Sequence, residues 1–318
     1  MSSAPISEIP APILTVSSDG SAQYEQVQEA IHAVPDNSTL PTIIRIKDGI
    51  YREKLDVPSS KKHLRIIGES REGTVLIYGD SASTLDSSGN ALGTSGSYSF
   101  RVQTNDFTAE HLTIQNDAGD NAGQAVALLA RGDRLVFRDV SLKGWQDTLY
   151  VNDGRQYYVD SYIEGDVDFI FGNATALFEN SVIHSLSNGY VTAASTAEEK
   201  SGYVFLNSRI TGDSSLAGTI PLGRPWRPYA NVVYINSYMD NHISASGWNN
   251  WSNPDNERTA RFAEFASYGP GANPKARFNW TTQLTTEEAE KYLPAQLFAG
   301  ADNWNPAAEL SLVQESAD

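Results

Sequence analysis

The chain has 318 residues, of which 40% are hydrophobic, contains no cysteine and carries a formal net charge of −16. Without cysteine there is no disulfide framework, no thiol nucleophile and no cysteine-based metal site. Nucleic acid is excluded as a partner because phosphate binding needs clustered Lys and Arg, and a polyanion would be repelled at long range, whereas a neutral or neutralised acidic polymer would not.

The N-terminal residues bear on where the protein acts. Residues 1–14 are rich in Ser, Pro and Ala and lack the basic and apolar segments of a signal peptide. The protein is therefore either intracellular or secreted with its signal peptide removed, and we expect residues 1–12 to form a flexible tail on a single domain that reaches residue 318. The sequence contains no apolar run of about 18 residues, which is the length that would predict a membrane span. Four glycosylation sequences support secretion, at Asn37, Asn173, Asn250 and Asn279.

Two short helices are predicted, one near each end of the chain. The first is indicated by apolar residues at helical spacing before Pro35, namely Val27, Ala30, Ile31 and Val34. The second begins with a capping box, in which Thr285 stands three positions before Glu288, and ends before Pro294. Nearly everything between these helices is typical of short strands.

The strands repeat. In six segments a polar residue, usually Asn or Asp, stands three positions before a large apolar residue, and these polar residues occupy positions 111, 139, 160, 180, 207 and 236. Their separations are all about 20 to 30 residues, and repeats of this length indicate a solenoid whose rungs share one core. The β-rich pattern predicts an all-β, right-handed parallel β-helix with short flanking helices, since a leucine-rich repeat would show a denser Leu frame. We expect the repeated polar residues to satisfy backbone groups at turns.

Two aspartates follow the rung spacing. Asp147 lies in Gly144-Trp145-Gln146-Asp147-Thr148-Leu149, and Asp168 lies in Gly165-Asp166-Val167-Asp168-Phe169-Ile170-Phe171-Gly172. The interval between them equals the local rung length, which is the interval between positions 139 and 160. Residues one rung apart stack at roughly 4.8 Å. Since strands disfavour aspartate, we expect these two carboxylates to lie side by side on one face for a chemical reason, and Asp166 to be structural.

Other polar residues fall on the same spacing. Gln124 stands about one rung before Gln146, and Arg224 stands two to three rungs after Asp168. Trp226 comes with Arg224. The sequence therefore predicts that two carboxylates, two amides, a guanidinium and an indole meet on one surface.

This set of residues suggests chemistry. Two carboxylates so close do not both ionise easily, so their pKa values separate. One then stays protonated as a general acid, and the other, paired with Arg224, stays ionised as a nucleophile or base. The amides of Gln124 and Gln146 are suited to holding an oxyanion.

The chain resembles the pectin methylesterases, or pectinesterases, over roughly residues 13–305. The resemblance rests on the two aspartate segments and on four further segments, which are Gly49-Ile50-Tyr51-Arg52-Glu53, Gln124-Ala125-Val126-Ala127-Leu128, Leu222-Gly223-Arg224-Pro225-Trp226 and Tyr268-Gly269-Pro270-Gly271-Ala272. It implies the single-stranded, pectin-lyase-like β-helix. The missing cysteines and the lack of an N-terminal inhibitory region look more like fungal or other microbial members than plant ones.

The resemblance also implies roles. Asp168 would be the nucleophile, Asp147 the acid/base and Arg224 the partner of Asp168. The amides of Gln124 and Gln146 would form the oxyanion hole, and the rings of Trp226 and Phe171 would line the sugar sites. It implies no metal and no cofactor. The substrate would be methyl-esterified homogalacturonan, cleaved at the C6 ester outside the cell by a monomer.

Three other functions are compatible with a β-helix. A pectate or pectin lyase would need a base to abstract the C5 proton and often calcium. A polygalacturonase would use paired carboxylates but has no evident use for the glutamines. A non-catalytic carbohydrate-binding solenoid would not need both aspartates.

Overall fold

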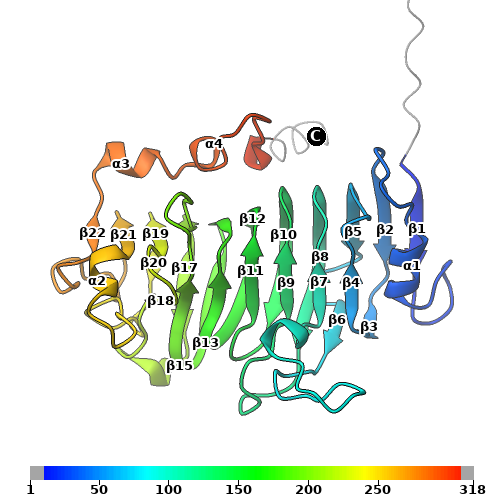
Figure 1. Ribbon diagram of the computed structural model, residues 1–318, viewed down its shortest axis with the longest axis horizontal. Helices are drawn as coiled ribbons and strands as arrows, with labels where there is room; N and C mark the ends of the chain where they lie inside the picture. Colours follow the sequence, from blue (N-terminus) through cyan, green and yellow to red (C-terminus); the bar gives the residue numbers. More distant parts are fainter. Residues whose placement is uncertain (1–10, 309–318) are drawn as a thin grey trace, which may run out of the picture.

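The computed structural model describes residues 11–308, so all but the last two residues of the expected tail, 1–12, lie outside the described part. The strands coil around one long axis and form a parallel β-helix, as predicted (Figure 1). All pairings between the named strands are parallel.

The strands form three faces that run the length of the helix. The first face contains β1 (Ile13–Val16), β2 (Thr42–Ile46), β5 (Leu64–Gly68), β8 (Phe107–Asn116), β10 (Leu135–Lys143), β12 (Arg155–Val159), β14 (Thr175–Glu179), β16 (Tyr203–Leu206), β19 (Asn231–Ile235), β21 (Arg261–Phe265) and β22 (Thr282–Gln283). The second contains β3 (Gly49–Arg52), β6 (Thr74–Tyr78), the second halves of β8 and β10, the first halves of β13 (Tyr162–Gly172) and β15 (Val182–Ala194), β17 (Arg209–Gly212) and β20 (Tyr238–Met239). The third contains β4 (Leu55–Val57), β7 (Phe100–Val102), β9 (Leu128–Arg131), β11 (Leu149–Asp153), the second halves of β13 and β15, and β18 (Arg224–Pro225).

The observed register confirms the predicted rungs. Val140 pairs with Leu112, Tyr162 with both Ser141 and Val182, and Arg209 with both Val182 and Tyr238. These pairings reproduce each interval between the six repeated polar residues, which all sit at the corner between the first and second faces. Each has a left-handed backbone, with φ between 48° and 54°. Asn and Asp tolerate this conformation better than other residues that carry a Cβ, so the repeat records a backbone requirement.

Aromatic side chains stack inside the helix two residues before five of these six corners. Phe137, Tyr158, Phe178, Phe205 and Tyr234 are buried, and successive ring centroids lie 4.8, 4.9, 4.6 and 4.5 Å apart. These distances match the inter-strand spacing of about 4.8 Å. The aromatic column thus packs without gaps when the rungs are in register.

The helices cover the ends and one face. Helix α1 (Val27–Ala33) packs on the first rungs, and α2 (Asn256–Thr259), which was not predicted, lies near the other end (Figure 1). The predicted capping box of Thr285 and Glu288 is present at α3 (Thr286–Glu290). Pro294 does more than end that helix, because it begins a second one, α4 (Pro294–Leu297). No helix in residues 11–308 is long and apolar enough to cross a membrane.

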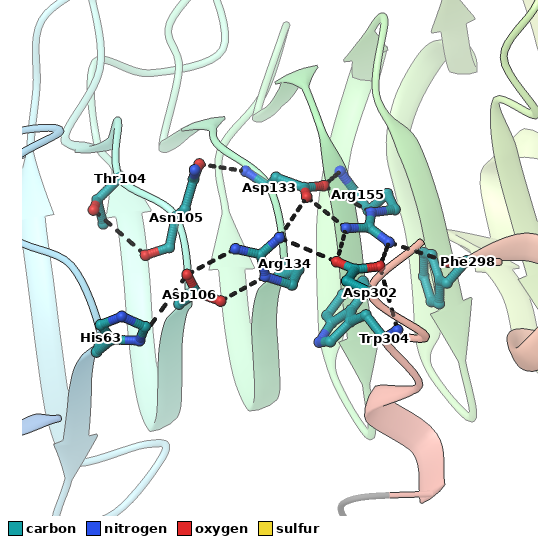
Figure 2. Close-up of polar contacts among 10 residues, drawn as sticks. All are labelled: His63, Thr104, Asn105, Asp106, Asp133, Arg134, Arg155, Phe298, Asp302 and Trp304. Atoms are coloured by element: carbon teal, nitrogen blue, oxygen red, sulfur yellow. Dashed lines mark hydrogen bonds and ion pairs between the residues drawn. The ribbon is translucent and has the colours of Figure 1, made fainter. Parts of the chain in front are cut away.

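The C-terminal strap, residues 284–308, runs back across the first face (Figure 1). Leu297, Phe298 and Trp304 cover an apolar cluster on the outside of β12, β14, β16 and β19. Figure 2 shows the alternating chain of charges that fixes the end of the strap. Arg155 donates 2.6 Å hydrogen bonds to both Asp133 and Asp302, and Arg134 bonds Asp106 at 2.6 Å and Asp302 at 3.1 Å.

A substitution at one left-handed corner tests the fold, because it changes only the preference of that residue for the left-handed backbone conformation. Asn207 is exposed, has a φ of 51° and makes no side-chain hydrogen bond within residues 11–308. At ordinary positions glycine is less stable than alanine by about 0.5–1 kcal/mol. At this corner we expect the opposite order. Urea unfolding should show Asn207→Gly near wild type and Asn207→Ala lower by about 1 kcal/mol. Equal stability of the two variants would mean that the corner conformation does not matter.

Candidate active site

The two aspartates occupy corners between the second and third faces. The N–H of Asp147 donates to the carbonyl of Val167 at 3.1 Å, and the strands continue in the same register with Leu149 beside Ile170. Asp147 and Asp168 therefore lie on neighbouring rungs. Both have a left-handed backbone, with φ of 65° and 54°. Such conformations cost of order 1–3 kcal/mol and persist where the surrounding structure enforces them.

Gly165 allows the two aspartate corners to approach. A Cβ at this position would lie 2.3 Å from the Cβ of Phe169 and 2.6 Å from the carbonyl oxygen of Trp145. Both distances are shorter than real contacts, so any larger residue would push the Trp145–Asp147 turn away from the next rung. The glycine thus sets the distance between the two carboxylates.

Arg224 holds Asp168 in a bidentate ion pair. Its Nε and Nη2 donate to the two carboxylate oxygens at 2.8 and 2.6 Å. The guanidinium itself is stacked between two rings, with its carbon 3.6 Å from the centroid of Trp251 and 3.9 Å from that of Tyr190. Arg224 comes from β18, two rungs beyond Asp168. This stacking fixes the fork of donors that orients the Asp168 carboxylate.

The environments of the two aspartates differ. Both are 7% exposed, but Asp147 makes no side-chain hydrogen bond within the described residues. Burial and the neighbouring charge of Asp168 raise the pKa of Asp147 to about 8. Burial also raises the pKa of Asp168, but the hydrogen bonds and charge of Arg224 oppose that rise. At neutral pH the site therefore favours a protonated Asp147 beside an ionised Asp168.

The carboxylates open into a cleft of about 550 Å³. Gln124 and Gln146 line this cleft, and their rungs are joined by a 3.1 Å hydrogen bond from Ala125 N–H to the Gln146 carbonyl. Neither side-chain amide has a partner within residues 11–308, so both can donate to a bound molecule. All seven residues predicted for the site, the two aspartates, two glutamines, Arg224, Trp226 and Phe171, line this cleft.

Aromatic rings form the floor of the cleft. Phe171 packs edge-on against Trp226, with centroids 5.9 Å apart, and stacks on Tyr150 at 4.2 Å. Tyr150 escaped the sequence analysis, although it stands one rung before Phe171, just as Asp147 stands one rung before Asp168. The same spacing that paired the aspartates could have found it.

Two further parts of the site have no such signal in the sequence. Tyr190 reaches Arg224 from the irregular middle of β15, where the register shifts, and Trp251 reaches it from a loop outside the rungs. The rim residues 92–95 belong to a long excursion between β6 and β7. Asn116 holds this excursion, since its side-chain amide donates to the carbonyls of Asp80, Ser97 and Val126 at 2.8–3.1 Å.

Asp166 stands apart from the other two acids and does not line the cleft. Its carboxylate accepts hydrogen bonds from the Val167 N–H at 2.5 Å and the Ser187 hydroxyl at 3.0 Å. The contact with Ser187 ties this rung to the next. Within residues 11–308 no three His, Asp or Glu side chains are grouped so that they could hold a metal ion.

This geometry can be set beside known proteins. The pattern of the Pectinesterase family matches residues 13–301. Pectinesterase 31 of Arabidopsis thaliana is 44% identical over 287 residues, which cover 88% of this chain and 90% of that protein. The structure of pectin methylesterase from carrot superposes with a TM-score of 0.85 at 34% identity, covering 93% and 96% of the two chains. A pectin methylesterase in complex with a hexasaccharide gives a TM-score of 0.81 at 35% identity, covering 92% and 98%.

The chain belongs to the pectinesterase family and is an enzyme that acts on pectin as a carboxylic ester hydrolase. The expected similarity to fungal or other microbial members rather than plant ones is not supported, because the Arabidopsis relative and the carrot structure are both from plants. A chain of this length can build a large core without disulfides, so the absence of cysteine says little about lineage.

The raised pKa of Asp147 predicts a pH-dependent stability. Its folded pKa is about 8 against an ordinary value of 3.8. The stability contributed by the protonated group is full below the ordinary pKa and is lost as pH rises through the folded pKa. An amide cannot ionise, so Asp147→Asn should not lose this stability as the pH rises. The free energy of unfolding of Asp147→Asn, relative to that of wild type, should therefore be larger at about pH 8.5 than at about pH 4.5, by at least about 1 kcal/mol.

Urea unfolding at the two pH values measures this gain. Asp120→Asn removes a carboxylate from an exposed loop and serves as the control, with the pH dependence of wild type. Parallel pH profiles for Asp147→Asn and wild type would contradict the raised pKa.

Proposed function

We propose that Asp168 and Asp147 act as nucleophile and acid/base in removing methyl esters from the C6 carboxyl groups of galacturonate in pectin. The observation that carries the proposal is the unequal environment of the two acids, one clamped by Arg224 and the other buried without a partner among the described residues. The hexasaccharide bound to a relative of the same fold supports a polymeric sugar substrate.

The first half of the reaction forms an acyl-enzyme. A carboxylate oxygen of Asp168 attacks the ester carbonyl carbon, and the carbonyl oxygen becomes an oxyanion that accepts hydrogen bonds from Gln124 and Gln146. The intermediate then collapses and breaks the bond to the methoxy oxygen. Asp147 gives its proton to that oxygen, so methanol leaves and an anhydride with Asp168 remains.

The second half reverses the proton transfer. Asp147, now ionised, takes a proton from water as the water oxygen bonds to the sugar carbonyl carbon of the anhydride. The second tetrahedral intermediate uses the same two amides. Its collapse breaks the bond to Asp168 and releases the galacturonic acid unit. Asp168 is again a carboxylate and Asp147 again carries a proton, so the site is ready for another ester.

The aromatic floor suits this substrate. Trp226, Phe171 and Tyr150 offer flat apolar faces to sugar rings beside the polar cluster. The polymer lies in the plant cell wall, so we place the site of action outside the cell. One chain supplies every residue that the proposed mechanism uses, so the mechanism itself requires no second subunit.

Substitution of either aspartate tests the assignment. We expect Asp168→Asn and Asp147→Asn to lower kcat for methanol release from esterified pectin by on the order of a thousand-fold or more. Asp166→Asn removes a carboxyl group from the same strand outside the cleft and should lose less than about ten-fold. Near-wild-type release by either of the first two variants would contradict the mechanism. Unsaturated products or new reducing ends in the wild-type reaction would instead favour a lyase or a glycosidase.

The two pKa values predict the pH profile. Asp147 must be protonated to release methanol, so kcat should fall as pH rises through about 8. Asp168 must be ionised, so activity should also fall in acid, with a midpoint above 3.8 because burial raises its pKa. Arg224→Gln should move the acid midpoint upward, since Arg224 favours the ionised form of Asp168. An unchanged acid midpoint in that variant would show that Arg224 does not influence the ionisation of Asp168.

A further inference from the structure

Gln124, one of the two amides proposed to hold the oxyanion, is fixed only through its backbone. Its side chain is exposed and makes no hydrogen bond within residues 11–308. Two glycines lie shortly before it, Gly119 and Gly123, with left-handed φ of 101° and 73°, and glycine restrains the chain less than any other residue. The place of the Gln124 amide therefore depends on what holds the backbone of residues 124–126, which we call the donor segment.

The excursion between β6 and β7 holds the donor segment from the side of the rim. This excursion comprises residues 79–99, and its residues 92–95 line the cleft (Figure 1). The N–H of Ala82 donates to the Gln124 carbonyl at 2.8 Å. The backbone of the proposed oxyanion donor is therefore bonded to the same loop that forms the rim of the cleft.

Asn116 joins both ends of the excursion to the donor segment. Its side chain is buried, and its amide nitrogen donates to the carbonyls of Asp80 and Ser97 at 2.8 and 3.1 Å. The same nitrogen donates to the Val126 carbonyl at 3.1 Å. The amide oxygen accepts a hydrogen bond from the Ala118 N–H at 3.0 Å. Since both ends of this amide are bonded, its orientation is fixed.

The hydroxyl of Ser97 makes a second connection between the rim and the donor segment. Ser97 is fully buried, and its hydroxyl donates to the Thr94 carbonyl at 2.7 Å. The same hydroxyl accepts a hydrogen bond from the Val126 N–H at 3.1 Å. Thr94 lines the cleft, so two hydrogen bonds lead from a rim residue to the donor segment. Breaking them would leave buried backbone groups without partners, which makes the rim and the donor segment one rigid unit.

We propose that Asn116 and Ser97 are positioning residues, which clamp the donor segment to the rim and so aim the Gln124 amide at the oxyanion. The inference rests on the proposed function, in which Gln124 donates to that oxyanion. A donor stabilises developing charge best when it is already in place before the charge forms. Neither Asn116 nor Ser97 lines the cleft, so both act through Gln124.

Methanol release from esterified pectin by the full-length enzyme, with kcat and KM measured separately, tests the proposal. We expect Asn116→Ala to lower kcat by about ten-fold or more and Ser97→Ala by about three-fold, because a misplaced donor is missed mainly in the transition state. KM should stay within about three-fold of wild type in both variants. An unchanged kcat in both variants would overturn the proposal, as would a loss of activity through KM alone.

A double-mutant cycle separates positioning from a general loss of packing. Gln124→Ala removes the donor itself and should lower kcat by roughly a hundred-fold. In that background Asn116→Ala and Ser97→Ala should each lower kcat by less than about two-fold further, because no amide is left to misplace. Losses as large as those in the wild-type background would show that the two residues act independently of Gln124, and the proposal would fail.

Ser208→Ala is the matched control. Ser208 is buried like Ser97, its hydroxyl donates to the carbonyls of Phe178 and Leu206 at 3.1 Å, and it lies outside the cleft. This variant loses comparable hydrogen bonds and should keep the wild-type kcat. If Asn116→Ala does not fold, Ser97→Ala supplies the same cycle.

The cycle also distinguishes two failures. An unchanged kcat in Gln124→Ala would contradict the oxyanion role of Gln124 in the proposed function, and the positioning role with it. A large loss in Gln124→Ala, combined with additive losses from Asn116→Ala and Ser97→Ala, would overturn the positioning role and leave the proposed function intact.

Discussion

The register between rungs is the constraint on which the rest of the molecule depends. A parallel β-helix brings residues one rung apart within the inter-strand spacing, and the core aromatic column fits only in that register. The left-handed corners turn the chain at matching positions in successive rungs. Because the two proposed catalytic acids also sit at left-handed corners, the packing that stabilises the core also sets how close Asp147 and Asp168 lie.

The chemistry follows from how the fold treats two similar groups. Two identical side chains, equally exposed, acquire different properties because one faces a stacked guanidinium and the other faces the cavity. The protein carries Arg224 on β18, two rungs away, and braces it between Tyr190 and Trp251. A lysine could not replace this arrangement, since only a planar fork stacks between rings and donates to both oxygens.

Much of this could be predicted from the sequence because it is periodic. The corner residues, the rung lengths, and the two aspartates and two glutamines of the cleft follow one spacing, which a repeat makes visible. Tyr150 obeys the same spacing and was overlooked. Tyr190 and Trp251 could not be predicted, because they reach Arg224 from a bulged strand and from a loop outside the rungs. The ion pairs that fix the strap join residues far apart in the sequence, such as Arg134 and Asp302. No sequence pattern predicts which of these residues pair.

The proposed mechanism requires that Asp147 holds a proton at neutral pH while Asp168 does not. Carbon-13 NMR of labelled aspartate carboxyl groups, titrated from about pH 3 to pH 10, measures this difference. One carboxyl group should titrate near pH 8 in wild type, and its signal should be absent from Asp147→Asn. A signal near that pH that survives in Asp147→Asn, or a spectrum in which every carboxyl group is ionised by pH 6, would contradict it.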